Sequence, residues 1–176
     1  MNIFFVDNNP LFAAADLCDQ HVSKMHTESV QLLVSLLNNL EIEHEIKTKA
    51  GSIHKGGYPN HPCCKWLEED FQNVAWLVRH AFALCYEHRR RFGRMPFSYE
   101  QLHNWVDAHW NVVNACLPDN GLTPPPQCVD EECRADDPVD AYRNYYIEVK
   151  SSMARWRHCD PPVWYTRAFD YAGVSE

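Results

Sequence analysis

Three polar side chains, His21, Lys24 and Glu28, follow one another along one side of a predicted helix. They lie at positions i, i+3 and i+7, and this spacing places them in one column over two helical turns. The same stretch carries an apolar stripe formed by Leu17, Met25, Leu32, Leu33 and Leu36. An imidazole, an amine and a carboxylate can move protons and stabilise positive charge. The alternative interpretation is a solvated polar face with a Lys–Glu pair.

Other catalytic patterns are weak in this sequence. There is no G-x-S-x-G, and the stretch GSIHKGG lacks the spacing and the Ser/Thr of a phosphate-binding P-loop, so we predict a flexible loop there. Zinc is an alternative because Cys and His are plentiful, and the first candidates for ligands are Cys128 and Cys133, which have four residues between them. Because no C-x-x-C pair is present, we predict no metal and no other cofactor.

The composition is that of a globular chain. Of the 176 residues 45% are apolar, and six Trp, eight Tyr and eight Phe supply bulky core material, so we expect one domain over residues 1–176. The N-terminus MNIFFVDNNP has no basic leader and no long apolar region. We therefore expect a cytoplasmic protein with reduced cysteines and no membrane partner, and its oligomeric state stays open.

The net charge of −8 is unfavourable for binding nucleic acid, but it is unevenly distributed. Residues 118–140 carry seven acidic side chains against Arg134, so the rest of the chain has a balance of only −2. A basic cluster, HRRRFGR, occupies residues 88–94. Its simplest interpretation is a solvated helix end, where the helix dipole favours cations.

Hydrophobic periodicity predicts an all-α fold, a four-helix bundle in one domain. A short extended segment, NIFFV, comes first and could lie across the bundle. The helices are expected at about 11–40, 62–92, 98–116 and 138–156, with an acidic, Pro-rich loop at 118–137.

Local signals place the helix ends. Asn60 or His61 caps the second helix, Pro62 occupies its first turn and Gly93 ends it. The pattern SYEQ at 98–101 predicts a capping box for the third helix, and Asp137 with its following proline opens the fourth.

Three stretches together resemble one family. DQH at 19–21 followed by Glu28, the segment GYPNHPCCKW and the C-terminal PPVWY are similar to the phage pyrimidine-dimer DNA glycosylase/AP-lyase (endonuclease V type) superfamily and its bacterial relatives. The chain also resembles uncharacterised phage proteins that begin with MNIF. The resemblance implies a helical enzyme that cleaves glycosidic bonds in modified or damaged DNA.

This resemblance assigns roles to the polar column. In the family an N-terminal α-amine attacks the sugar, and a glutamate seven residues after the histidine assists, which carries over to Glu28. Because Asn2 is too large to favour removal of the initiator methionine, the amine here would belong to Met1, with Lys24 as the second candidate nucleophile. An α-amine has a pKa near 8, and is more readily unprotonated than a lysine. His21 could orient Glu28 or hold a phosphate.

Four further residues are candidates for substrate binding. Asn60 and His61 precede a helix start, where backbone N–H groups can bind an anion. Trp164 and Tyr165, in the C-terminal PPVWY, could stack on a base.

Two other functions stay open. The same fold could act on a free nucleotide or nucleoside derivative, which needs no extended cationic surface. Alternatively, the chain could be a non-catalytic phage accessory protein that binds a host protein.

Overall fold

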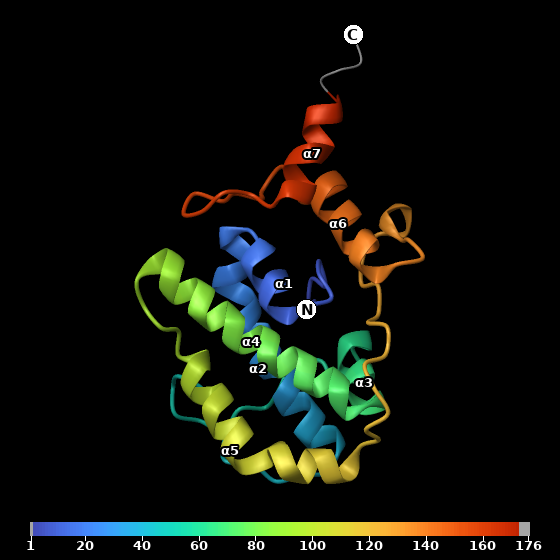
Figure 1. Ribbon diagram of the computed structural model, residues 1–176. Coiled ribbons are helices and arrows are strands. Elements are labelled where there is room, and N and C mark those ends of the chain that lie inside the picture. Colours follow the sequence, from blue (N-terminus) through green and yellow to red (C-terminus); the bar gives the residue numbers. More distant parts are fainter. Residues whose placement is uncertain (1, 173–176) are drawn as a thin grey trace.

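The computed structural model describes residues 2–172, and in this range the regular secondary-structure elements are all helices, joined by loops. Figure 1 shows the arrangement. The α-helices of this range are α1 Pro10–Asp16, α2 Asp19–Asn39, α3 Pro62–Glu69, α4 Phe71–Phe92, α5 Ser98–Cys116, α6 Pro138–Glu148 and α7 Val163–Ala172. A 3-10 turn, η1, covers Glu131–Cys133. The all-α class is therefore confirmed. The first two of the four expected helices are each divided, the third has its expected bounds, the fourth is shorter, and α7 is additional.

The long helices α2 and α4 pack against each other and form the centre of the molecule (Figure 1). Helices α1 and α5 also pack on α4, and α3 packs on both α2 and α4. The loop after α5 runs along the side of this group and leads to α6 and α7 (Figure 1). The core between these elements contains fully buried aromatic side chains, including Trp66, Trp105, Tyr142 and Tyr146.

The prediction of one helix at 11–40 was wrong in one respect, because the chain is broken there into α1 and α2. Leu17 and Cys18 are extended there. The guanidinium of Arg91 donates to the carbonyl oxygens of Ala15 at 2.6 Å and Leu17 at 2.7 Å. These carbonyls at the end of α1 would otherwise lack donors, so a distant arginine stabilises the break.

The second expected helix is also divided, at Asp70. The Asp70 carboxylate accepts a hydrogen bond from the Gln72 amide at 2.8 Å, which caps α4, and a second from the Asn120 amide at 2.8 Å. The predicted ends are confirmed. His61 caps α3, Pro62 lies in its first turn, and Gly93 ends α4 with a φ of 76°, which favours glycine.

Three details near the third and fourth helices differ from expectation. Helix α5 has the predicted bounds, but its capping box is absent because the Ser98 hydroxyl bonds the His26 ring at 2.8 Å. Helix α6 begins after the predicted cap, Asp137, and already ends at Glu148. The following segment is held instead by α2, where the Asp19 amide donates to the Arg155 carbonyl at 2.8 Å. The helix α7 was not predicted.

The N-terminal segment forms no helix and lies against the helices, as expected, and it turns at Phe4, where the Val6 amide donates to the Phe4 carbonyl at 2.8 Å. Ile3, Phe4, Phe5 and Val6 are all buried in the core. The segment before α1 is thus fixed by apolar burial next to α2.

In the described part of the chain, no helix combines the length and the apolar character that crossing a membrane requires.

Candidate active site

The predicted column on α2 lines a pocket of about 270 Å³. His21, Lys24 and Glu28 contribute from α2, and the N-terminal segment and the end of α6 close other sides. The remaining lining residues are Asn2, Phe4, Met25, Cys128, Tyr145 and Lys150. Spacing along one helix therefore brought together the three residues that the sequence singled out.

Glu28 is the buried acid of this pocket. Its residue is 7% exposed, and its two carboxylate oxygens have different partners. Oε1 contacts the Lys24 ammonium at 2.7 Å, and Oε2 accepts a hydrogen bond from the backbone amide of Asn2 at 3.0 Å. The carboxylate thus contacts the start of the chain directly.

The conformation of the N-terminal segment is fixed by Asn2. Its side-chain oxygen accepts hydrogen bonds from the amides of Ile3 at 2.7 Å and Phe4 at 3.2 Å, and its side-chain nitrogen donates to the Cys128 carbonyl at 2.8 Å. Phe4 has a φ of 50°, which is uncommon for a bulky residue. Strained backbone of this kind persists where surrounding contacts over-determine it, as they do beside Glu28.

His21 is a neutral, buried ring at the pocket wall. It stacks on Phe4 with 4.0 Å between ring centroids, and one ring nitrogen forms a short hydrogen bond with the hydroxyl of Tyr146. Burial lowers the pKa of His21 to about 4, and the nearby charges of Lys150 and Lys24 act in the same direction. His21 is therefore a neutral hydrogen-bonding group at pH 7.

Two lysines supply positive charge at the pocket. The side chain of Lys24 is 69% exposed and reaches Glu28 from the solvent side. Lys150 lies with its ammonium 4.7 Å from the ring centroid of Tyr145, and both line the pocket. Beside neutral His21, the pocket therefore holds two lysine ammonium groups and one carboxylate.

The first candidate nucleophile, Met1, lies outside the described residues. The described geometry ends at Asn2, whose backbone nitrogen forms the peptide bond with Met1. That nitrogen is the atom that donates to Glu28.

Asn60 and His61 do not line the Glu28 pocket. The His61 ring accepts a hydrogen bond from the Cys63 amide at 3.1 Å, and the Cys64 amide donates to the His61 carbonyl at 2.8 Å. These first-turn amides are therefore engaged already. A role of Asn60 and His61 in substrate binding stays a prediction.

Trp164 and Tyr165 lie behind the pocket wall. Trp164 meets Tyr146 edge to face at 5.8 Å between centroids and donates to the Asp16 carboxylate at 2.6 Å. Tyr165 packs on Trp156 at 4.6 Å. These contacts give both rings packing partners around Tyr146, and their stacking on a base stays a prediction.

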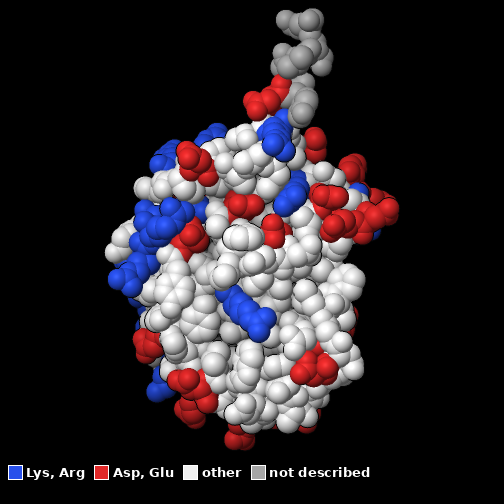
Figure 2. Space-filling view, in the orientation of Figure 1, with Lys and Arg blue, Asp and Glu red and all other residues white. Residues whose placement is uncertain are grey.

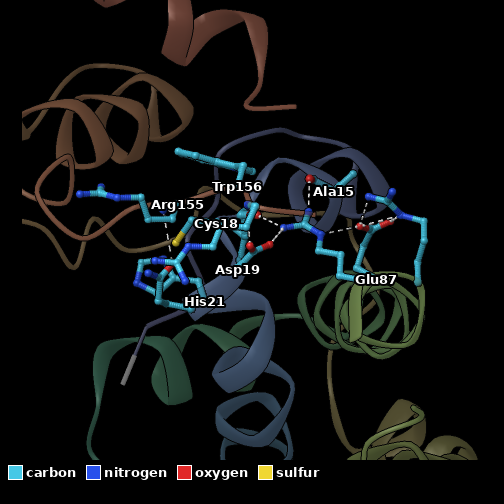
Figure 3. A network of polar contacts seen from close by, with 12 residues as sticks. Ala15, Cys18, Asp19, His21, Glu87, Arg155 and Trp156 are labelled. Carbon is cyan, nitrogen blue, oxygen red and sulfur yellow. Dashed lines mark hydrogen bonds and ion pairs between the residues drawn. The ribbon is translucent and has the colours of Figure 1, made fainter. Parts of the chain in front are cut away.

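A polar network behind the pocket joins α1, α2 and α4. Figure 3 shows it from His21 and Cys18 to Asp19, Ala15 and Glu87. The Cys18 amide donates to the hydroxyl of Tyr146 at 3.3 Å, the same hydroxyl that bonds His21. The network therefore couples the orientation of the His21 ring to the α1–α2 junction.

A second groove lies at α2. It is lined by Asp19, Gln20 and Ser23 from α2, together with Phe92, Arg155, Arg157 and His158. Figure 2 shows basic side chains gathered near the end of α4, with some acidic ones among them, and a dense group of acidic side chains at the opposite edge, around η1. The acidic segment around η1 thus lies away from the groove, whose own acidic residue is Asp19.

Cys128 lies next to Cys63, and not next to Cys133, with which the sequence had grouped it as a candidate zinc ligand. Cys128 lines the Glu28 pocket, and its sulfur lies 3.7 Å from the sulfur of Cys63. A hydrogen bond from the Cys63 thiol lowers the pKa of Cys128 to about 7, and the same bond raises the pKa of Cys63. Cys133 is buried in η1.

A family model described as pyrimidine dimer DNA glycosylase matches residues 1–96. The match covers more than half of the 176 residues and includes the N-terminal segment and all of α2. The chain belongs to this family. No curated protein and no solved structure matches the chain. Membership in the pyrimidine dimer DNA glycosylase family confirms the resemblance drawn from DQH, Glu28 and NHP, and its description names DNA as the substrate.

Several pocket residues were missed in the sequence. Asn2 was considered only for its effect on methionine removal, and Phe4, Tyr145 and Lys150 were not singled out. The signal for Asn2 was its position at the start of a segment that precedes the glutamate helix. Tyr145 and Lys150 reach the pocket because the segment around the end of α6 lies next to His21, more than 100 residues away in the sequence, which no local pattern reveals.

Proposed function

We propose that the protein is a glycosylase and AP lyase that acts on modified or damaged pyrimidines in DNA. The nucleophile is the N-terminal α-amine, and Glu28 is its acid–base partner. The observation that carries this proposal is the hydrogen bond of 3.0 Å between the Asn2 backbone nitrogen and Glu28. If Met1 is kept, the α-amine belongs to Met1 and lies one residue from this hydrogen bond. If Met1 is removed, the Asn2 nitrogen is itself the α-amine.

The proposed reaction begins when the neutral amine attacks C1′ of the target nucleotide. The C1′–N glycosidic bond breaks, and the base leaves with the bonding electrons and takes up a proton. The C1′–O4′ bond then opens, O4′ takes a proton, and a protonated imine remains on C1′. Loss of a proton from C2′ expels the 3′ phosphate. Glu28 accepts the amine proton, returns it to O4′ and stabilises the cationic transition state.

The neighbouring groups have supporting roles in this scheme. The contact between Lys24 and Glu28 is an ion pair of 2.7 Å, which needs an ammonium group, whereas the attacking amine must be unprotonated. We therefore assign Lys24 to phosphate contact and to the orientation of Glu28. Neutral His21, fixed by Phe4 and Tyr146, offers a hydrogen bond to the sugar or phosphate.

The charge distribution supports DNA over a free nucleotide as the substrate. The groove around Arg155 and Arg157 includes Ser23 of α2, and the next residue along the chain, Lys24, lines the Glu28 pocket. Such a surface suits a run of phosphates on either side of the target base. The densest group of acidic side chains, around η1, lies at the other edge of the molecule (Figure 2), whereas the acidic composition of the whole chain had favoured a small ligand.

The test uses Glu28→Gln and a duplex oligonucleotide with a single cyclobutane dimer or abasic site. An amide cannot carry the negative charge that the cationic transition state needs, so we expect kcat to fall by about 100-fold or more. The matched control is Glu68→Gln, since Glu68 also pairs with a lysine, Lys65 at 3.1 Å, but does not line the pocket. Its activity should equal that of the wild type.

Activity of Glu28→Gln within tenfold of the wild type, or less than about 1.4 kcal/mol of barrier, would contradict the assigned role. Circular dichroism and the urea midpoint of both variants establish that the fold is kept. Tight binding of a nucleotide without any action on DNA would instead favour the free-nucleotide alternative.

A further inference from the structure

Three side chains of types that can bind a metal converge at the start of α3. They are His61, Cys63 and Cys128, and their ligand atoms all lie within 4.8 Å of one another. Cys63 is buried, whereas His61 and Cys128 are partly exposed, so a metal ion can reach the group from solvent. Two thiolates and one imidazole form a donor set that zinc prefers and that occurs in catalytic zinc sites.

The spacing of the two sulfur atoms fits coordination. With a Zn–S bond of about 2.3 Å, tetrahedral geometry places two sulfurs about 3.8 Å apart. The sulfurs of Cys63 and Cys128 are 3.7 Å apart. A disulfide would need them at about 2.05 Å. We infer that His61, Cys63 and Cys128 bind one zinc ion, which leaves a fourth coordination position for water or another donor.

The local sequence prepares two of the three ligands. Pro62 occupies the first position of α3, so its fixed φ sets the chain between His61 and Cys63. The His61 ring accepts a hydrogen bond from the Cys63 amide at 3.1 Å. A ring that binds metal through one nitrogen carries its proton on the other, so metal binding at either nitrogen ends this acceptor role. In the proposed site the ion orients the His61 ring, in place of the hydrogen bond that caps α3.

The third ligand comes from a loop next to the Glu28 pocket. Cys128 lines that pocket, and its carbonyl oxygen accepts the Asn2 side chain at 2.8 Å. The loop also carries the acidic side chains of residues 130–132, which attract cations. Zinc at this position joins α3, the acidic loop and, through Asn2, the segment that contacts Glu28. It holds the wall of the pocket in place.

The test measures zinc in protein purified without chelators, followed by chelation and titration with Co²⁺. We expect one equivalent of metal per chain and a thiolate-to-cobalt charge-transfer band of a tetrahedral site. Removing a group that only hydrogen-bonds to a metal ligand already lowers metal affinity by about 10- to 100-fold. Removing a ligand itself, in Cys63→Ser or Cys128→Ser, should therefore lower it by more than about 100-fold. Cys133→Ser and Cys116→Ser are the matched thiol controls and should bind like the wild type.

Cys128→Ser is the decisive variant, because Cys128 is partly exposed and Cys63 is fully buried. In the wild type, zinc should also protect two of the eight thiols from alkylation. No stoichiometric uptake by the wild type, unchanged uptake by Cys128→Ser, or loss of uptake in Cys116→Ser, whose thiol is exposed, would each overturn the site. Isolation of a Cys63–Cys128 disulfide that binds no metal after reduction would overturn it too. Metal uptake is measured apart from DNA cleavage, so it does not depend on the proposed function.

Discussion

Arg91 should be the most sensitive single residue of the scaffold that positions the site. Its side chain is fully buried, and its guanidinium donates to four oxygens. Ala15, Asp19 and Glu87 lie around this group in Figure 3, and the fourth partner is the carbonyl of Leu17. Replacing Arg91 with Met keeps much of the side-chain volume and removes every donor.

The magnitude follows from what the substitution leaves behind. Buried Asp19 keeps one hydrogen bond, from the Arg157 amide at 2.8 Å, and loses its ion-pair partner at 3.1 Å. Breaking a buried pair by removing one member costs about 3–5 kcal/mol, and native domains have only about 5–15 kcal/mol. For a chain of this size we expect the melting temperature to fall by about 6–20 °C.

The assay is urea unfolding followed by circular dichroism, with Arg90→Met as the matched control. Arg90 is the neighbouring arginine, it also pairs with Glu87, at 2.7 Å, and its side chain is 53% exposed. An exposed pair contributes about 0–1 kcal/mol, so this variant should be nearly unchanged. A loss in Arg91→Met below about 1 kcal/mol, or equal to that in Arg90→Met, would refute the reasoning.

Three further predictions concern the core, the helix break and the pocket. Burial lowers the pKa of His80 to about 3, so below pH 6.5 the unfolded state binds a proton that the folded state does not, and stability falls as the pH drops. The free energy of unfolding of His80→Phe, relative to that of the wild type, should therefore be about 2 kcal/mol higher at pH 5 than at pH 8, measured by urea unfolding at both pH values. Asp70→Ala removes the cap of α4 and should cost about 1–2 kcal/mol in the same assay, with an unchanged value counting against the cap. Tyr146→Phe removes the hydrogen bond to His21 and should lower kcat/KM on an abasic duplex about tenfold, and equal kinetics would show that this bond does not orient the ring.

The polar column and several helix ends could be predicted because they depend on local signals. The i, i+3, i+7 spacing placed His21, Lys24 and Glu28 in one pocket, and Pro62 and Gly93 marked helix ends by their backbone restrictions. These features need only neighbouring residues. Local signals did not suffice everywhere, since the capping box predicted at Ser98 is absent and α6 ends earlier than expected.

The breaks and the rest of the pocket depend on distant contacts. Between α1 and α2 there is no proline or glycine, and the carbonyls at the break are satisfied by Arg91 from α4. The pair Cys63–Cys128 joins residues 65 positions apart, so the spacing of Cys128 and Cys133 was misleading. Loop closure over such distances leaves no periodic trace in a sequence.

The most direct test of the proposed mechanism is borohydride trapping on an abasic duplex, followed by mass mapping of the peptides. The account predicts a reduced covalent adduct on the N-terminal peptide, on the α-amine of the first residue present, and no adduct after selective acetylation of that amine. An adduct on Lys24, or full trapping by the acetylated protein, would contradict it.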